Sequence, residues 1–519
     1  MRIWKGILRK TGEGWKKEGG KAKKRGGEWM AFHGKIVILR KTYNHMITTE
    51  IIYQLFRELN GVPRPSWHEE KVADWLCQKA KSAGLAFERD AHNCVVIRKE
   101  ATAGHEAAET IVLHAHMDMV CVAEKGKSFD PLKDGIEAYV EDGWMKARGT
   151  SLGADNGIGL CMALAVMLSD DLVHGPLELL VTTNEEDGMT GAQHLSEDFV
   201  KGRKMIDLDS EDYDVITVGA AGAYLQTASL PFTQQDTPEG YRFFRISISG
   251  GLGGHSGVDI GKGRMSAVKE ICHLLAEAEK LCPSLMVAEI NAGEANASIP
   301  ANAEAVVGVA ADEAERLTDW AKLLHIETEG DKNVKVTVEG CETPTLIINK
   351  EWVKKLVSAI EEIPFGVIKM SENMPGTVET SNNIGVIRTE QGQFRVTSHS
   401  RSFLYDVMVQ LGEHIGSILR QHGFATEVVM STPAWEENPE SEFMHLVEQS
   451  FEDVLGFRPR KVEMHFVMEM GYFVQKFKGI QIIPIGPRII EPHSTSERVE
   501  LETIDNIYQV LVEILRREA

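Results

Sequence analysis

The sequence predicts an α/β protein with a largely parallel sheet and flanking helices, interrupted by an inserted α+β segment. Three observations support this. Between residues 46 and 224, short continuous apolar runs alternate with helical patterns, as in a parallel sheet covered by helices. Between residues 225 and 433, apolar and polar residues alternate, as in half-exposed antiparallel strands. From residue 434 to 519 the first pattern returns, which indicates that the insert interrupts one domain.

Bulk composition narrows the class of protein. The chain has 519 residues, more than one ordinary domain needs, and 43 % of them are apolar, enough for sizeable cores. A formal net charge of −21 argues against a nucleic-acid partner. The seven cysteines are scattered without a C-x-x-C pair, which fits a reducing compartment and a cytoplasmic location. No run of 18 apolar residues predicts a membrane span.

The first 45 residues differ from the rest. They contain 13 Lys and Arg against 3 Asp and Glu, and the stretch "KKEGGKAKKRGGEW" has neither helical nor strand periodicity. We therefore expect residues 1–45 to be a basic, disordered extension. A targeting peptide is the alternative, although no clean apolar core is followed by small residues. A further hypothesis is that translation begins at Met46.

The elements of the first domain follow from periodicity. Apolar residues at helical spacing predict helices, and short apolar runs predict buried strands. The predicted helices cover residues 46–59, 70–85 and 155–168, with strands over 93–101, 110–120 and 177–188. A helix over 440–456 and a strand over 479–487 complete this domain.

The elements of the insert follow from strict alternation and two helical patterns. The predicted strands cover residues 223–230, 241–250, 334–340, 385–390 and 394–402. The predicted helices cover residues 265–281 and 403–423. Residues 225–433 therefore read as a separate α+β unit.

Metal-capable side chains gather where the predicted strands of the first domain end. His114, His116 and Asp118 are spaced by two, so a strand points them to one face. Ligands in open α/β sheets bind at the carboxyl ends of strands. Other candidates stand at a helix start, at strand ends or in a loop, namely Asp155, Glu185, Glu186, Asp209 and His493.

This set of side chains suits a pair of zinc ions. Histidine nitrogens and carboxylate oxygens bind zinc, and one carboxylate can bridge two ions. Neighbours such as Glu185 and Glu186 face different directions on an extended chain, so one can bind metal and the other can act as a general base. Each residue alone is more often structural, and "NEED" alone is more often a solvated turn. The joint pattern favours a metal site.

The order and spacing of the motifs resemble the di-zinc metallopeptidase family that includes carnosinase and carboxypeptidase G. Its aminoacylhistidine (Xaa-His) dipeptidase branch is the most similar. The resemblance runs from residue 46 to the C-terminus. The motifs that carry it are "VPRPSWHEE", "HMDMV", "GTSLGADNGIG", "TTNEEDGMTGA", "DLDSED", "GGLGGHSG", "VETSNNIG" and "PHSTSERV".

The resemblance implies a role for each candidate around the metals. Two Zn²⁺ ions are expected, with Co²⁺ or Mn²⁺ able to substitute. One ion would be bound by His116 and Asp209, and the other by Glu186 and His493. Asp155 would bridge them through a cis Asp155–Asn156 peptide bond. Glu185 would be the general acid and base, and Asp118 would orient His116, with His114 as a neighbour that binds no metal.

The resemblance also makes the insert a lid that contacts the substrate. His255 would reach the substrate carbonyl oxygen and Arg401 its C-terminal carboxylate, with Asn296 as a further lid contact. The competing interpretations are a Gly-rich hairpin around His255 and a surface position for Arg401. The family more often has apolar residues before that Arg.

A second departure concerns the pocket wall. The branch usually reads H-A-G-L-E-C-G, whereas this chain reads "HFVMEMG" over residues 465–471. Glu469 and Gly471 are kept as substrate-binding candidates, but Phe466, Val467 and Met470 are larger than their counterparts. The metal chemistry is therefore expected to persist, whereas the side-chain preference is open.

Taken with the resemblance, the sequence predicts a cytoplasmic zinc dipeptidase that cleaves unblocked dipeptides, Xaa-His above all. Another exopeptidase or deacylase of the family, such as a tripeptide aminopeptidase, is one alternative, and a non-catalytic binding protein is another. The expected partner is a small peptide, with neither nucleic acid nor membrane. Many family members form homodimers through the lid, but a lid of about 200 residues could equally serve a single chain.

Overall fold

The computed structural model describes residues 49–372 and 374–519. The extension predicted over residues 1–45 lies outside this range. A helix covers residues 49–59, close to the predicted one. The description below follows the sheets, because their strand order determines which loops meet.

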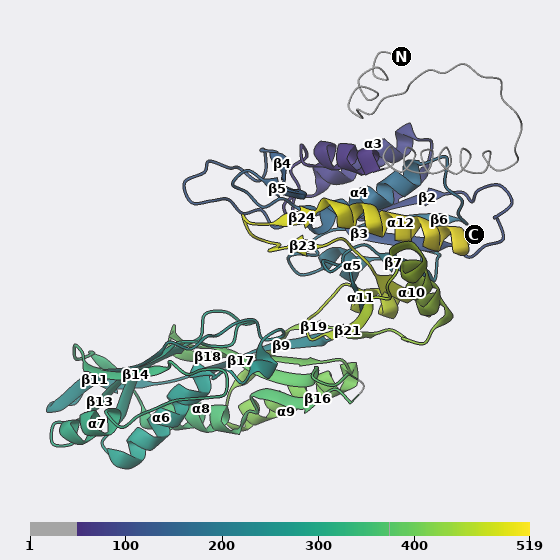
Figure 1. The fold of residues 1–519 in the computed structure, drawn as a ribbon. Coiled ribbons are helices and arrows are strands. Elements are labelled where there is room, and N and C mark those ends of the chain that lie inside the picture. The colour runs from purple at the N-terminus through teal and green to yellow at the C-terminus, as the bar shows by residue number, and fades with distance from the viewer. Residues whose placement is uncertain (1–48, 373) are drawn as a thin grey trace, which may run out of the picture. The chain divides into compact units, whose positions relative to one another are not determined.

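A six-stranded mixed sheet organises the first domain (Figure 1). Its strands, in spatial order, are β1 (Ala86–Arg89), β2 (Val95–Lys99), β6 (Leu177–Thr182), β3 (Ile111–His116), β7 (Lys204–Asp207) and β22 (Gln481–Pro484). The four strands from β6 to β22 run parallel. The strands β1 and β2 form an antiparallel edge. The predicted parallel sheet is thus present, with an antiparallel extension.

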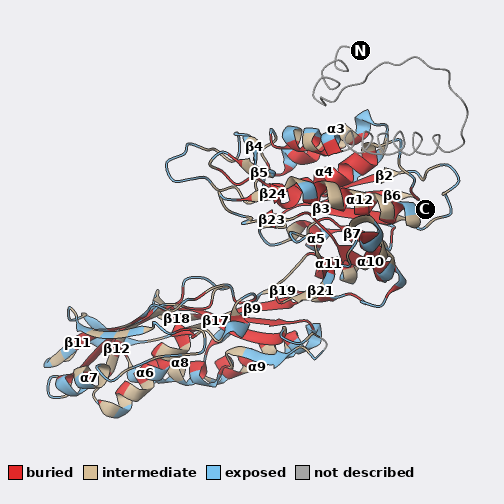
Figure 2. Cartoon of the chain, viewed as in Figure 1, coloured by how far each residue is buried: buried red, intermediate tan, exposed pale blue. Residues whose placement is uncertain are grey.

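Helices cover this sheet, as the apolar runs predict. They are α3 (Glu70–Ser82), α4 (Ala154–Leu168), α5 (Thr190–His194), α10 (Glu442–Leu455), α11 (Met470–Lys476) and α12 (Leu501–Arg517). Helix α4 packs on β3 and β6, and α3 packs on β1 and β2. All of α4 except its last residue is buried (Figure 2), as expected for a helix that is apolar on every side.

Two smaller sheets complete this domain. One contains β20 (Trp435–Glu436), β8 (Val215–Ala220) and β21 (Arg460–Met464). The other contains β23 (Ile489–Ile490), β24 (Arg498–Glu500), β5 (Trp144–Ala147) and β4 (Ala138–Glu141). The loop between β23 and β24 carries His493, so pairing with β5 fixes the position of that loop.

The insert, defined here as residues 222–432, is built on an eleven-stranded antiparallel sheet. Its strands are β9 (Gly222–Pro231), β10 (Gln234–Asp236), β11 (Tyr241–Ser249), β12 (Met286–Ala292), β13 (Ala303–Ala310), β14 (Lys335–Gly340), β15 (Leu346–Ile348), β16 (Gly366–Met370), β17 (Val378–Glu390), β18 (Gln393–Ser402) and β19 (Ala425–Thr432). The helices are α6 (Ala267–Leu281), α7 (Ala314–Ala321), α8 (Lys350–Glu362) and α9 (Tyr405–Gln421), with a 3-10 turn η1 (Ile260–Lys262).

The insert differs from the sequence prediction in its elements and in its burial. The elements that were not predicted are helices α7 and α8 and strands β10, β12, β13, β15, β16 and β19. The strand over residues 394–402 was expected to be half-exposed, but Val396–Ser402 of β18 are all buried. The physical reason is that β18 lies between β17 and β9 and also packs against α9. Its alternation of polar and apolar residues therefore does not reflect solvent on one face.

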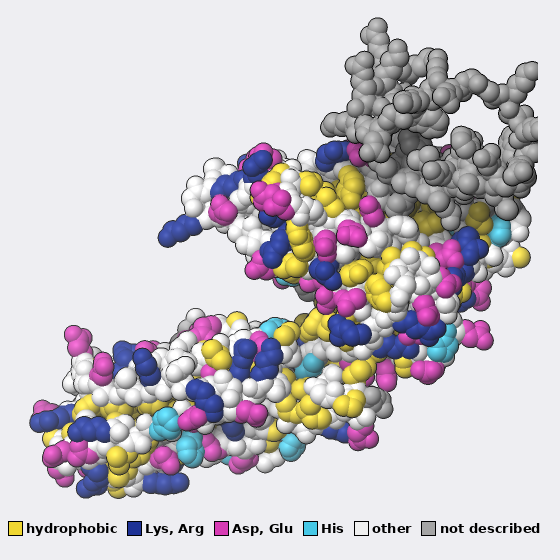
Figure 3. Space-filling view, in the orientation of Figure 1, with side chains coloured by type: hydrophobic (Ala, Val, Ile, Leu, Met, Phe, Trp, Pro, Cys, Tyr) yellow, Lys and Arg dark blue, Asp and Glu magenta, His cyan; other side chains and the backbone are white. Residues whose placement is uncertain are grey.

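The surface carries charges of both signs. On the face drawn in Figure 3, acidic and basic side chains are interspersed over the described residues. Within residues 49–372 and 374–519, no helix combines the length and the apolar character that crossing a membrane requires.

Candidate metal centre

Strand order brings the predicted metal ligands together. His116 is the last residue of β3, Glu185 and Glu186 follow β6, and Asp209 follows β7. Because β6, β3 and β7 are adjacent and parallel, their carboxyl ends meet at one edge of the sheet. Asp155 comes from the first turn of α4, and His493 from the loop between β23 and β24.

These residues form two groups that share one carboxylate. Nε2 of His116 lies 3.1 Å from Oδ1 of Asp155 and 3.3 Å from Oδ1 of Asp209. Nε2 of His493 lies 3.0 Å from Oδ2 of Asp155 and 2.8 Å from Oε2 of Glu186. In each group the ligand atoms lie within 4.8 Å of one another. Asp155 belongs to both groups and offers a different oxygen to each.

Backbone hydrogen bonds hold Asp155 in this position. Oε2 of Glu497 accepts from the backbone N–H of Leu152 and Gly153, and its Oε1 accepts from Ala154 and Asp155 at 2.7 and 3.3 Å. The Asp155–Asn156 peptide bond is cis, as predicted. The Nδ2 group of Asn156 donates to the Leu208 carbonyl at 2.9 Å and also to Oδ1 of Asp209.

Asp118 lies behind His116. Its Oδ1 is 3.3 Å from Nδ1 of His116, which leaves Nε2 of that ring facing the two carboxylates. Asp118 also accepts from the hydroxyl of Ser66 at 2.8 Å and from the backbone N–H groups of Glu185 and Glu186. One buried carboxylate therefore fixes both a histidine and the acidic loop after β6.

Glu185 lies beside the two groups and belongs to neither. Burial raises the pKa of its carboxyl well above the usual range, and the nearby carboxylates of Asp209, Glu469 and Glu186 raise it further, while His116 opposes them. A carboxyl whose proton affinity is raised by its surroundings is suited to accept and return a proton.

The pKa values of three candidate ligands are strongly shifted by burial and by their neighbours. Hydrogen bonds to Asp155 and Glu186 raise the pKa of His493 to about 11. Burial raises the pKa of Asp209 to about 7, against the effect of His116. Burial opposes ionisation of Asp155, but hydrogen bonds from His116 and His493 outweigh it and lower the pKa of this carboxyl.

His114 belongs to a different buried network. Its Nδ1 lies 2.6 Å from Oδ1 of Asp207, and its Nε2 lies 3.1 Å from the hydroxyl of Thr182 and 3.3 Å from Oε2 of Glu469. Thr182 donates to the same Glu469 oxygen at 2.7 Å. Burial opposes protonation of His114, but the two carboxylates prevail and raise its pKa to about 9. His114 is thus a neighbour of the site and is in neither ligand group.

A cavity of about 280 Å³ opens at the two groups. Asp155, Glu185, Glu186, Asp209 and His493 line it on one side. Phe466 and Val467 line it on another, so two of the three substituted residues form its wall. Met470 packs instead in a hydrophobic cluster with other buried residues of that region.

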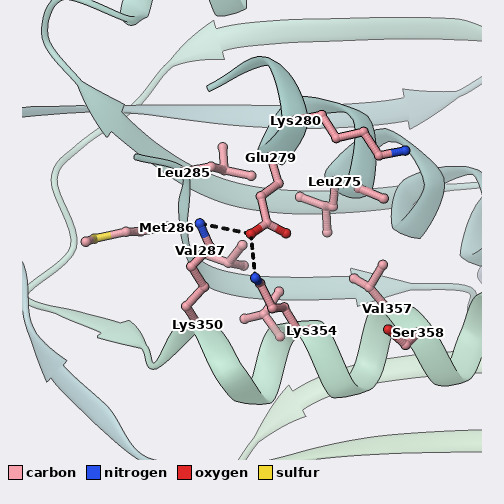
Figure 4. A pocket seen from close by; sticks show the side chains of 12 residues that line it. Leu275, Glu279, Lys280, Leu285, Met286, Val287, Lys350, Lys354, Val357 and Ser358 are labelled. Carbon is pink, nitrogen blue, oxygen red and sulfur yellow. Dashed lines mark ion pairs between the residues drawn. The ribbon is translucent and has the colours of Figure 1, made fainter. Parts of the chain in front are cut away.

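The insert has a cavity of its own between α6, α8 and β12, also about 280 Å³ (Figure 4). Its lining includes Glu279, which pairs with Lys350 and Lys354 at 2.9 and 3.2 Å. Neither of the metal-ligand groups found among the described residues lies there.

The predicted substrate-binding residues of the insert form a second cluster. His255 and Arg401 lie close enough for Arg401 to lower the pKa of His255, in addition to the effect of burial. Arg401 is 3 % exposed, which excludes a surface position. The carbonyl of Asn296 accepts from Asn383 at 3.4 Å. None of these insert residues lines the cavity at the metal groups.

The two remaining candidates lie at the start of α11. Glu469 is buried, and its Oε1 has no hydrogen-bond partner among the described residues. Gly471 is buried in α11, where an added Cβ would lie 2.2 Å from the carbonyl oxygen of Pro433. Glycine is therefore required there by close backbone approach.

Several supporting residues were missed from the sequence. Arg64 is buried and donates to the carbonyls of Asp118 and Gly153 at 2.8 and 2.6 Å. Glu69 accepts from the backbone of Asn184 at 3.0 Å. Arg64, Ser66 and Glu69 all lie in "VPRPSWHEE", and Glu497 lies in "PHSTSERV". All four residues therefore lie in motifs already singled out in the sequence. Their residue types alone did not show which backbone groups they would bind.

The donor set fits two divalent cations. Each group offers one imidazole nitrogen and two carboxylate oxygens, which is a common zinc ligand set. Oε1 of Glu186 is buried without a hydrogen-bond partner among the described residues, so this carboxylate has spare capacity to bind. The shared Asp155 matches the bridging carboxylate of a dinuclear site.

The known proteins to which this chain is similar are peptidases. The model of peptidase family M20/M25/M40 matches residues 112–517. The cytosol non-specific dipeptidase of Escherichia coli is 33 % identical over 479 residues, covering 91 % of this chain and 98 % of that protein. An aminoacylhistidine dipeptidase from Vibrio alginolyticus superposes with a TM-score of 0.79 at 31 % identity, covering 90 % of this chain and 96 % of the other. The aminopeptidase PepT of Bacillus cereus shares the fold, with a TM-score of 0.58, 17 % identity and coverage of 91 % and 98 %.

Proposed function

Because the chain belongs to peptidase family M20/M25/M40, we propose that it is a dinuclear zinc dipeptidase that cleaves unblocked dipeptides. The observation that carries this proposal is Asp155, whose two oxygens face two separate histidines, each with a further carboxylate. A binding protein on the same scaffold would not need this shared ligand together with an adjacent free carboxyl.

In this proposal His116 and Asp209 would hold one cation, Glu186 and His493 would hold the other, and Asp155 would contribute to both. When bound, such cations supply a water of lowered pKa and polarise a peptide carbonyl. Nitrogen and oxygen donors are compatible with zinc, and Co²⁺ or Mn²⁺ can use the same set. Asp118 holds the His116 ring so that Nε2 points to the site.

Glu185 then acts as general base and general acid. It lines the cavity beside the ligands without belonging to either group. Its backbone N–H donates to Asp118 at 3.1 Å, which positions the carboxyl relative to His116. It would take a proton from the attacking water and return it to the leaving amine.

His255 supplies a hydrogen-bond donor for the carbonyl oxygen as negative charge develops there. Its Nδ1 accepts from the backbone N–H groups of Gly257 and Val258, both at 3.3 Å. The hydrogen of the neutral ring is therefore on Nε2, the nitrogen left for a substrate. The insert would bring this donor to the site by closing as a lid.

The two ends of the dipeptide have separate candidates. Arg401 can pair with the C-terminal carboxylate through two N–H groups, because its Nε and Nη1 have no partner among the described residues and its Nη2 makes only a 3.4 Å bond to Ser256. Glu469 offers an unpartnered carboxylate oxygen near Glu185 for the amino end. Asn296 and Gly471 would complete the contacts.

The similar proteins indicate which substrates to test first and where in the cell the protein would act. An aminoacylhistidine dipeptidase is among the similar structures, so Xaa-His is the first class to test. A cytoplasmic location is supported by the E. coli relative, which is named a cytosol enzyme. The protein would act either as a monomer or as a homodimer formed through the insert. Light scattering would distinguish the two states by their mass.

A substrate panel tests the proposal. Purified protein with two equivalents of Zn²⁺, Mn²⁺ or Co²⁺ would be assayed with Ala-His, Ala-Ala, Ala-Ala-Ala and an N-acetyl amino acid. We expect hydrolysis of the dipeptides and little of the other two. Preferential cleavage of the tripeptide or the acyl compound would assign another activity of the family, and cleavage of none would favour a binding protein.

A further inference from the structure

A buried cluster of one arginine and two histidines includes a residue of the loop that lines the cavity at the candidate metal groups. In that loop, Met464 and Phe466 line the cavity. His465, between them, is 7 % exposed and lies with its Nε2 2.8 Å from the hydroxyl of Ser381 on β17. The cluster is defined here as Arg401, His399 and His465.

Arg401 has no counter-ion. No Asp or Glu within residues 49–372 and 374–519 pairs with it, and its one side-chain contact is a long 3.4 Å bond from Nη2 to the hydroxyl of Ser256. Burying a guanidinium without an opposite charge is costly, so the position is suited to an anion that arrives with a ligand. One α-carboxylate would pair with two of its N–H groups.

The two histidines add more hydrogen-bonding capacity than one carboxylate uses. His399 is 4 % exposed and stands two residues before Arg401 on the same face of β18. The Asn296 carbonyl lies near the His399 ring, but neither ring nitrogen has a partner at normal hydrogen-bond geometry among the described residues, and the same holds for Nδ1 of His465. Buried polar groups are normally paired, so these nitrogens indicate a second polar ligand group.

The electrostatics indicate the charge of that group. Burial and the neighbouring Arg401 and His255 lower the pKa of His399 well below its usual range, with the Asn296 carbonyl acting weakly in the opposite direction. Burial, Arg401 and His255 also lower the pKa of His465 to about 3. Both rings are therefore neutral beside one fixed positive charge. Once the α-carboxylate has neutralised Arg401, a second anionic group would still raise the pKa of the imidazoles and favour a protonated ring, whereas a neutral group would not.

Building on the proposed dipeptidase activity, we propose that His399 and His465 select dipeptides whose C-terminal residue has an acidic side chain. The α-carboxylate pairs with Arg401, and the side-chain carboxylate of Asp or Glu accepts hydrogen bonds from the two imidazoles. Hydrogen bonds to a charged group exceed those to a neutral one, so the acidic side chain is distinguished from its amide.

Matched substrates isolate this charge. The kcat/KM values of Ala-Glu and Ala-Gln would be compared, and likewise those of Ala-Asp and Ala-Asn, since each pair differs in charge at almost constant shape. We expect the acidic member to be favoured by about tenfold or more. His399→Leu should reduce this ratio to about one and change the value for Ala-Gln much less. A wild-type ratio near one, or a ratio that the variant leaves unchanged, would overturn the proposal.

A control variant and a binding readout separate the possible failures. Thr397→Val removes a buried hydroxyl two residues before His399 on the same strand face, and it should keep the wild-type ratio. His399→Met replaces the ring with an apolar side chain that has no N–H donor, and it tests the idea if the leucine variant does not fold.

Calorimetric binding of L-glutamate and L-glutamine to the full-chain protein does not depend on turnover. If no dipeptide is cleaved, the proposed activity fails, yet tighter glutamate binding that His399→Met removes still supports the anion site. Equal binding of the two amino acids overturns it.

Discussion

Oδ2 of Asp155 lies 3.0 Å from Nε2 of His493, although the two residues are 338 positions apart in the chain. The other oxygen of the same carboxylate lies 3.1 Å from Nε2 of His116. Asp155 thus joins the N-terminal and C-terminal parts of the first domain at one point. Each of the following predictions depends on this arrangement or on the residues that support it.

Replacing Asp155 with asparagine should lower the zinc content from two ions per chain to at most one. The amide lacks the negative charge that a bridging ligand supplies, and both groups share this residue. Metal analysis after gel filtration measures the loss. Asp212→Asn is the matched control, because Asp212 is exposed, lines the same cavity and belongs to neither group. Full zinc content in Asp155→Asn would exclude a bridging role.

Glu185→Gln should lower kcat by about 10²-fold or more, the usual range for loss of a general base, while two zinc ions stay bound. The amide has nearly the same shape but cannot accept the proton. Single-turnover kinetics with Ala-His, beside metal analysis, would show both effects. If the variant loses metal instead, the roles assigned to Glu185 and Glu186 are exchanged.

His255→Ala should keep folding and zinc content and lower kcat by about a hundredfold at least, because one donor to the developing oxyanion is lost. His255→Gln retains an N–H group and should recover part of the rate. Turnover within a few-fold of wild type would leave His255 as a residue of its glycine-rich loop and no more.

His114 should stabilise the fold in a pH-dependent way. Its pKa in the folded protein is about 9, above the ordinary value of 6.5, so its contribution is complete below about pH 6.5 and is lost as the pH rises through about 9. A shift of this size corresponds to about 3 kcal/mol.

Urea unfolding in EDTA measures this contribution when the wild type is compared with His114→Gln. The difference in the free energy of unfolding should be large at pH 6.5 and small at pH 9.5. A difference that does not change with pH would contradict a charged His114 between Asp207 and Glu469.

Much of the metal site was predictable because it depends on local pattern and strand order. Short apolar strands place His116 and Asp209 at their ends, and the order of β6, β3 and β7 makes these ends neighbours. The resemblance to a known family added the roles and the cis bond before Asn156, which the structure contains.

The supporting contacts were not predictable in the same way. Glu497 accepts four backbone N–H groups from a turn more than 340 residues earlier, and no periodicity encodes such a long-range contact. The burial of His399 and Arg401 could not be predicted from the sequence for a related reason. An alternating polar strand predicts one solvent face, but β18 is covered by contacts that come from distant segments.

If dipeptide cleavage needs two cations in the groups around Asp155, the rate must depend on how much zinc is bound. A zinc titration of the metal-free full chain, followed by the rate of Ala-His hydrolysis, measures this dependence. We expect no hydrolysis without zinc and a rate that rises until two equivalents per chain are bound. A plateau at one equivalent, or hydrolysis that does not respond to zinc, would contradict the dinuclear mechanism.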